Sequence, residues 1–195
     1  MKSTRLEAFS DGVLAIIITI MVLEMKAPAG PEWSNLRPVL SVFLTYVLSF
    51  IYVGIYWNNH HHMLQATERV SGAVLWANLH LLFWLSLIPF VTRWMEHEQF
   101  AEAPTVLYGV VLLMAALSYW LLQRLIVSMH GTNAKLEQAI GGDTKGKWSI
   151  GLYLAAIIAA FWAPWLAVAF YAAVALMWLI PDRRIEKKLE DDDEA

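Results

Sequence analysis

The chain has no cysteine among its 195 residues. A protein without cysteine has no disulfide framework, no thiolate metal site and no thiol nucleophile. Charge is also scarce, because only 16% of the residues are Asp, Glu, Lys or Arg, against about 25% in an average soluble protein. The net charge of −3 includes no basic excess, so the sequence carries no electrostatic footprint for nucleic acid.

Apolar and aromatic residues take the place of the missing charge. Hydrophobic residues make up 58% of the chain, and ten residues are tryptophan. Indole rings sit well at the level of lipid headgroups, where one edge is apolar and the other is wet. This composition is typical of a membrane protein.

Six apolar stretches approach the length of a membrane span, since a hydrocarbon core of roughly 30 Å needs about 20 helical residues. The sequence therefore predicts an all-α integral membrane protein with six transmembrane helices in one domain, residues 1–181. The predicted spans cover residues 6–25, 36–58, 70–95, 104–128, 148–163 and 165–180. The last two are short, and Pro164 between them predicts a tight hairpin, with a single kinked helix as the alternative.

The basic residues test the number of spans. With a cytoplasmic N-terminus and six spans, all but three of the 14 Lys and Arg residues lie on the inner side. The three on the outer side are Lys26, Arg37 and Arg93. This distribution follows the positive-inside bias, whereas one span over residues 148–180 places the C-terminal basic cluster on the wrong side. We therefore predict that both termini are cytoplasmic and that residues 182–195 form a charged cytoplasmic tail.

The start of the chain superficially resembles a cleaved secretory signal peptide. A basic MKSTR precedes an apolar run, and the run is followed by the small residues APA. Glu7 and Asp11 offset the positive charge of the first residues, and Glu24 and Lys26 precede the small residues. These four charges favour a retained first span.

Asp11 lies at the entrance of the first predicted span. An ionisable group in a span costs about 2.5–3.5 kcal/mol on insertion scales, which indicates a functional or tightly partnered residue. The second span ends on the same side of the membrane and the third begins there, so their polar residues share its depth. We predict a hydrogen-bonded cluster of Ser10, Asp11, one of His60–His62, Asn78 and His80. Polar packing between helices, with no further role, explains such a cluster equally well.

The histidine run in NNHHHM offers a second interpretation, a metal site. Consecutive histidines on a helix point about 100° apart and cannot grip one ion from a single face, although His80 could join from the third span. Because no cysteine or paired carboxylate accompanies them, we expect no metal and no cofactor. A histidine-dependent membrane transporter or membrane enzyme remains the alternative function.

The first span also has a helical stripe of its own. Four residues spaced by 4, 3 and 4 positions fall on one face: Gly12, Ile16, Thr19 and Leu23. Ile20 lies beside this stripe, and Asp11 and Ile18 fall on a neighbouring one. One face of the helix can thus meet its own subunit while another meets a symmetry axis. Ordinary lipid contact accounts for the pattern as well, because almost every residue from 13 to 23 is apolar.

Residues 5–11 read RLEAFSD, which resembles the RxxxFSD signature at the start of the first span in the transmembrane protein 175 family. The members of this family are potassium-permeable channels of bacteria, archaea and animal endolysosomes. The segment YWNNHHHM resembles the end of the family's second span, and LWANLHLLFWLSLIPF resembles its third. The resemblance covers the first half of the chain strongly and the second half only in hydropathy.

The resemblance implies a potassium-permeable cation channel and no enzymatic activity. Family members have no TVGYG loop, and neither does this chain, so no ring of backbone carbonyls is expected to select the ion. Instead, the first helix of each subunit lines the pore, and apolar side chains form its constriction. On this sequence the constriction corresponds to Ile16, Thr19 or Ile20, and Leu23.

The resemblance also implies a structural role for the signature. The arginine, phenylalanine, serine and aspartate of the signature face polar groups on the next two spans and lock the pore helix in place; here they are Arg5, Phe9, Ser10 and Asp11. As their partners we predict His61, Asn78 and His80.

One signature and one set of six spans resemble the single-repeat prokaryotic members of the family. Those members assemble as tetramers around one axis. The resemblance therefore implies a homotetramer in a prokaryotic plasma membrane, with the lipid bilayer and monovalent cations as its partners. Potassium is the permeant ion and not a cofactor, and we expect no nucleic-acid partner.

Overall fold

The structure is a computed structural model that describes residues 3–65, 67, 70–129 and 144–179. The predicted charged tail, residues 182–195, lies outside the described residues. So do seven of the eleven basic residues that the topology prediction assigns to the inner side of the membrane.

The described residues form helices and no strands, which confirms the all-α prediction. The elements, in chain order, are α1 (Thr4–Leu23), the short 3-10 helix η1 (Trp33–Asn35), α2 (Leu36–Gln65), α3 (Gly72–Ser86), α4 (Ile88–His97), α5 (Glu102–Met129), α7 (Thr144–Ala160) and α8 (Pro164–Leu179).

Four helical stretches are long and apolar enough to cross a membrane: α1, α2, α3 with α4, and α5. The stretch from Gly72 to His97 is interrupted at Leu87, where α3 ends and α4 begins. Pro89 in the first turn of α4 has no backbone N–H and cannot donate to the preceding turn. The predicted third span is therefore two helices in line.

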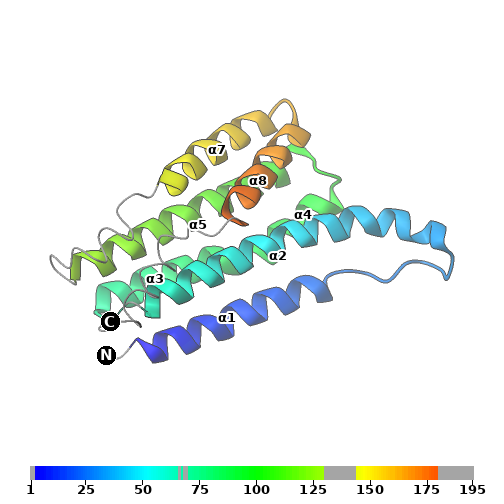
Figure 1. Cartoon of the computed structure of the whole chain (residues 1–195). Coiled ribbons are helices and arrows are strands. Elements are labelled where there is room, and N and C mark those ends of the chain that lie inside the picture. Colours follow the sequence, from blue (N-terminus) through cyan, green and yellow to red (C-terminus); the bar gives the residue numbers. More distant parts are fainter. Residues whose placement is uncertain (1–2, 66, 68–69, 130–143, 180–195) are drawn as a thin grey trace.

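The last two helices form a hairpin. α7 has 17 residues and α8 has 16, so each is about 24–26 Å long at 1.5 Å per residue, somewhat less than a hydrocarbon core. They pack against each other along their length, and the chain turns back between Ala160 and Pro164 (Figure 1). The alternative of one kinked helix is not the arrangement in the structure.

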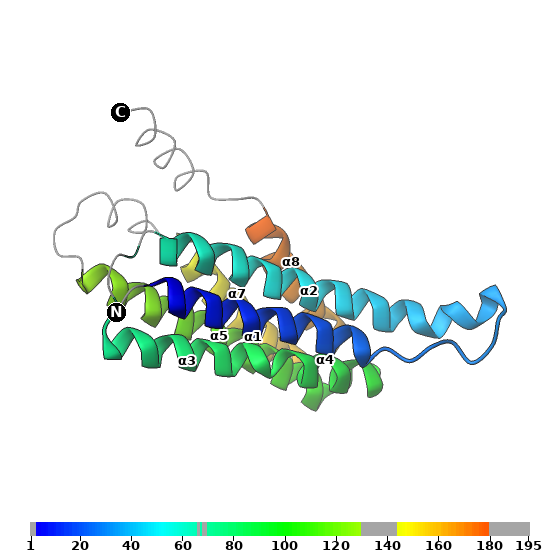
Figure 2. The ribbon, with the colours of Figure 1, turned by 90° about the horizontal axis from the view of Figure 1, so that it is seen from below.

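The bundle has two sides. α1 packs against α2, α3 and α4, and Figure 2 shows it lying along the face between α2 and the α3–α4 pair. α5 packs against α3 on one side and α7 on the other, so that α7 and α8 lie across the bundle from α1 (Figure 1). This asymmetry leaves one long face of α1 without a neighbour in the subunit.

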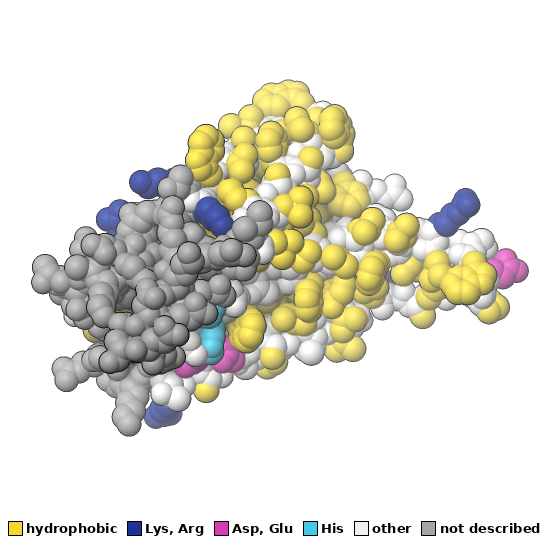
Figure 3. Space-filling model, viewed as in Figure 1, with side chains coloured by type: hydrophobic (Ala, Val, Ile, Leu, Met, Phe, Trp, Pro, Cys, Tyr) yellow, Lys and Arg dark blue, Asp and Glu magenta, His cyan; other side chains and the backbone are white. Residues whose placement is uncertain are grey.

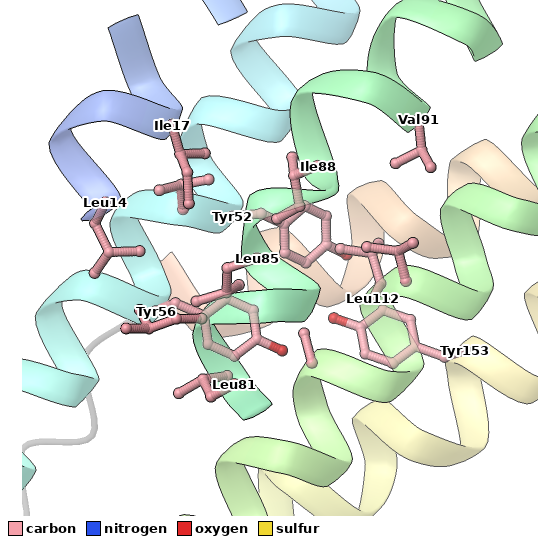
Figure 4. Close-up of a cluster of buried hydrophobic side chains, with 14 of the residues drawn as sticks. Leu14, Ile17, Tyr52, Tyr56, Leu81, Leu85, Ile88, Val91, Leu112 and Tyr153 are labelled. Carbon is pink, nitrogen blue, oxygen red and sulfur yellow. The ribbon is translucent and has the colours of Figure 1, made fainter. Parts of the chain in front are cut away.

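The core is apolar and aromatic. Leu14 and Ile17 of α1 point toward Tyr52 and Tyr56 of α2 and toward Leu85 of α3 (Figure 4), and all five side chains are buried. The outer surface is also apolar: hydrophobic side chains cover much of the face in Figure 3, and basic side chains lie toward the ends. A protein that is apolar both inside and outside suits a lipid environment.

Candidate functional site on the first helix

A buried chain of hydrogen bonds joins α1 to α2 and α3. The Asn78 amide nitrogen on α3 donates to Ser10 Oγ on α1 at 3.0 Å, and its amide oxygen lies 2.7 Å from His60 Nε2 on α2. Ser10 and Asn78 are fully buried, and His60 is 1% exposed. Because an amide oxygen can only accept, His60 carries its hydrogen on Nε2.

The line along which α1 contacts α2 and α3 is called the seam below. A second pair of contacts lies along it, closer to the surface. Trp57 Nε1 on α2 donates to Asp11 Oδ1 at 3.1 Å, and His61 Nδ1 lies 2.9 Å from Glu7 Oε1. The rings of Trp57 and His61 stack, with their centroids 5.9 Å apart. One turn of α2 therefore holds two carboxylates of α1.

His80 joins a different pair of helices. It accepts from Trp84 Nε1 through Nε2 at 3.0 Å, and its Nδ1 lies 2.9 Å from Ser118 Oγ on α5. Since Nε2 accepts, Nδ1 carries the hydrogen, and His80 has the tautomer opposite to that of His60. The structure thus corrects the prediction that His80 is a partner of the signature; it ties α3 to α5.

The predicted stripe of α1 is exposed in the subunit. Gly12, Ile16, Thr19 and Leu23 all face outward, with Ile16 58% and Leu23 81% exposed. Ile20 is exposed beside them. The opposite face of the helix, with Leu14, Ile17 and Met21, is buried in the core. α1 is therefore attached along one face and apolar along the other.

An ion pair fixes the far end of α1. Glu24, which follows the last residue of α1, pairs with Arg93 of α4. Both side chains border a mainly apolar groove between α1 and α4 that Ile16, Ile20 and Phe90 also line. The sequence analysis predicts only that Arg93 lies on the outer side of the membrane and gives no partner for it, so this pair is a finding of the structure.

Comparison with known proteins places the chain in a family. The family described as endosomal/lysosomal potassium channel TMEM175 matches residues 5–89. A potassium channel of Chryseobacterium sp. (strain P1-3) is 54% identical over 192 residues, which cover 98% of this chain and 100% of that protein. The chain belongs to the TMEM175 family.

Two further proteins match most of the chain. A potassium channel of Streptomyces collinus is 28% identical over 191 residues, covering 91% of each chain. The crystal structure of a lysosomal potassium-selective channel TMEM175 homolog from Chamaesiphon minutus has a TM-score of 0.73 and 27% sequence identity. The match covers 91% of this chain and 96% of that one, so the likeness extends to the second half, where the sequence pattern was weak.

The TMEM175 signature residues divide between two faces of α1. Ser10 and Asp11 contact α3 and α2, as described above. Arg5 and Phe9 instead lie exposed on the subunit surface. Positions 5, 9, 12, 16, 19 and 23 advance by alternating steps of 4 and 3, so Arg5 and Phe9 continue the exposed stripe. This differs from the prediction that all four residues face the next two helices.

Sequence reasoning placed Asn78 correctly but missed other partners. The prediction leaves one of His60–His62 for the cluster and names His61 as a partner; the structure bonds His60 to Asn78 and His61 to Glu7, and it adds Trp57 as the partner of Asp11. A usable signal was the spacing of α2, since positions 57, 60, 61 and 64 share one side of a helix. The seam therefore extends over residues 57–61 of α2, about one helical turn, and is not limited to one histidine.

Proposed function

We propose that this chain is one subunit of a potassium-permeable cation channel in which α1 from each copy lines the pore. The observation that carries the proposal is the exposed apolar stripe of a helix whose other face is anchored in the bundle. A helix with one unpartnered face suits a symmetric assembly, where identical faces meet around an axis. The names of the relatives, which are potassium channels, support this function.

The seam between α1, α2 and α3 suits a pore helix that must keep its orientation. Ser10 bonds inward to Asn78, and Asp11 bonds sideways to Trp57. Hydrogen bonds in two directions around the helix axis oppose rotation of α1, whereas apolar contacts alone tolerate it. In this proposal Asp11 positions the pore helix and does not bind the ion.

The proposed constriction is apolar. Ile16 and Leu23 lie about two turns apart on the exposed stripe, with Ile20 beside them. The Thr19 hydroxyl donates to the Ile16 carbonyl at 2.9 Å, which directs its polar atom to its own helix. Apolar side chains arranged in a ring around the pore axis oppose wetting and control the passage of ions without a filter of backbone carbonyls.

The proposed assembly is a homotetramer in a prokaryotic plasma membrane with both termini in the cytoplasm. Four spans are supported by length and composition, and the hairpin of α7 and α8 would complete six. The partners are the lipid bilayer and monovalent cations, with potassium as the permeant ion. The proposal includes no cofactor and no nucleic acid.

The test of the proposal compares Ile16→Asn with Ile18→Asn. Ile18 is the matched control, because it is partly buried and lies on the stripe of α1 next to the exposed one. Amide groups at position 16 should wet the constriction, and potassium and sodium flux into liposomes should both rise while the discrimination between them falls. The Ile18 variant should keep the parent's selectivity, or fail to assemble.

Two results contradict the proposal in different ways. If Ile16→Asn assembles and leaves flux and selectivity unchanged while Ile18→Asn alters both, the pore face is assigned wrongly. If neither the parent nor any variant conducts potassium, the chain is not a channel of this kind.

The alternative of a histidine-dependent transporter or enzyme gains no support from the described residues. Within those ranges, no three His, Asp or Glu side chains form a group able to hold a metal ion. His60, His61 and His80 each bond to a different partner. They join helices and do not converge on a common centre.

A further inference from the structure

A cleft opens between four helices on the side of the bundle away from α1. Residues of α2, α5, α7 and α8 line it, and most of the lining is apolar or aromatic. Tyr56 of α2 and Tyr153 of α7 form part of its inner wall, and both are buried. Ala116 of α5 lines it as well and leaves space there because its side chain is small.

Basic side chains and tryptophans border this cleft. Lys147 and the tryptophans Trp120 and Trp178 line it directly. Arg124 lies over the Trp120 ring, 4.7 Å from its centroid, and Lys145 lies 5.8 Å from the centroid of Trp178. No acidic residue is among the described residues that line the cleft. Its border is therefore cationic.

The position of the cleft fits the boundary between hydrocarbon and headgroups. α7 begins and α8 ends beside it, and both helices lie across the bundle from α1 (Figure 1). Tryptophan together with Lys or Arg marks the level of lipid headgroups. A cleft at this level has acyl chains on one side and phosphate groups on the other.

From this arrangement we infer that the cleft binds one anionic phospholipid. An acyl chain enters the apolar space beside Tyr56, Tyr153 and Ala116, and the phosphate lies against Lys147 near Arg124. Basic pockets between transmembrane helices recognise anionic headgroups in this way. The inference requires only that the bundle lies in a bilayer, so it does not depend on ion conduction.

The test measures lipid bound to the purified full-length protein by native mass spectrometry. Phosphatidylglycerol and phosphatidylcholine with identical acyl chains are the two probes. The parent protein should retain phosphatidylglycerol in preference to phosphatidylcholine. Lys147→Ala should lower the affinity for phosphatidylglycerol about fivefold, which is the effect of one basic residue near a headgroup. Arg124→Gln should lower this affinity as well, because it removes the positive charge that lies over Trp120 at the border of the cleft.

Two controls separate the cleft from general charge effects. Arg37→Ala removes an exposed basic residue near the start of α2, far along the helix from the cleft, and should leave lipid binding unchanged. Ala116→Phe fills the apolar part of the cleft without changing charge and should reduce retention of both lipids. Size-exclusion chromatography establishes that each variant assembles as the parent does.

Two outcomes overturn the inference. The first is equal retention of the two lipids by the parent, and the second is an equal loss in Arg37→Ala and Lys147→Ala. Because binding is measured without ion flux, failure of the channel proposal leaves this test intact.

Discussion

At the scale of single residues, Asn78 is the centre of the seam that holds α1. Its amide group uses one donor toward Ser10 and its acceptor toward His60, so a single side chain connects three helices. All three side chains are buried where no lipid or solvent can replace a lost partner. The cost of removing Asn78 therefore depends on what it leaves unpaired.

We expect Asn78→Leu to destabilise the folded protein by about 1–3 kcal/mol, because the His60 Nε2–H loses its acceptor in a buried site. Replacing both partners by apolar groups removes the unpaired donor, so Asn78→Leu with His60→Phe should recover much of the loss. Thermal unfolding in detergent measures both effects. Asn59→Leu is the control, since the amide of Asn59 donates to the Ile55 carbonyl of its own helix. A double variant as unstable as the sum of its singles contradicts this account.

At the scale of helices, α5 joins the first half of the bundle to the second, because it packs against α3, α4, α7 and α8. It lies very close to the α7–α8 hairpin at Gly109, where an added Cβ would lie 2.8 Å from Ile157 Cγ1 and closer still to the Tyr171 hydroxyl. The Tyr171 hydroxyl, which comes from α8, donates to the Thr105 carbonyl of α5 at 3.0 Å. Small residues allow close backbone approach between membrane helices, and Gly109 provides it here.

Gly109→Ala should therefore destabilise the protein by about 1–3 kcal/mol, as other overpacked sites do. Gly54→Ala in α2 is the matched control, because an added Cβ there meets nothing within 4 Å. Replacing glycine by alanine within a helix should stabilise it by up to about 1 kcal/mol. Opposite shifts of the unfolding temperature are the expected result. Equal shifts in the two variants would show that helix propensity, and not the contact with the hairpin, decides the outcome.

The helices were predictable to the extent that hydropathy defines them. The predicted start of the second span at residue 36 is the start of α2, but the helix continues to Gln65 through the histidine run. Hydropathy ends a span where polar residues begin, whereas the helix continues because His60 and His61 find partners on α3 and α1. The predicted third span also lacks the break at Leu87, since an apolar run conceals the effect of Pro89.

The sequence predicts how deep the residues of the candidate site lie in the membrane, but not toward which helix each side chain points. The rise per residue placed Ser10, Asn78 and His80 at similar levels, and two of them bond to each other. Depth along a helix does not fix its rotation, so His80 was assigned to α1 although it faces α5. For Phe9 the helical period alone would have sufficed, because it lies on the stripe that was already identified.

At the scale of the whole molecule, the two sides of the bundle present different surfaces. α1 exposes Phe9, Ile16 and Leu23 along one stripe, and the side across the bundle holds the α7–α8 hairpin (Figure 1). In the proposed tetramer the first side is covered by other subunits and the second faces lipid. The two sides should therefore respond differently to the same substitution.

Two phenylalanines make this comparison direct. Phe9 on α1 is 52% exposed in the subunit, and Phe161 in the turn between α7 and α8 is 51% exposed. Truncation of either to alanine removes a similar exposed apolar area from one subunit. If α1 meets its copies around an axis, only the Phe9 side chain becomes buried by assembly, and only its loss weakens the contact.

We expect the purified parent to have four times the 22.1 kDa of one chain, measured by light scattering with the detergent contribution subtracted. Phe9→Ala should shift the population toward smaller species as the protein is diluted, and Phe161→Ala should keep the parent's mass over the same range. A parent with the mass of one chain refutes the assembly outright. Dissociation of Phe161→Ala but not of Phe9→Ala places the subunit contact on the hairpin, and the stripe of α1 would then face lipid instead of a pore.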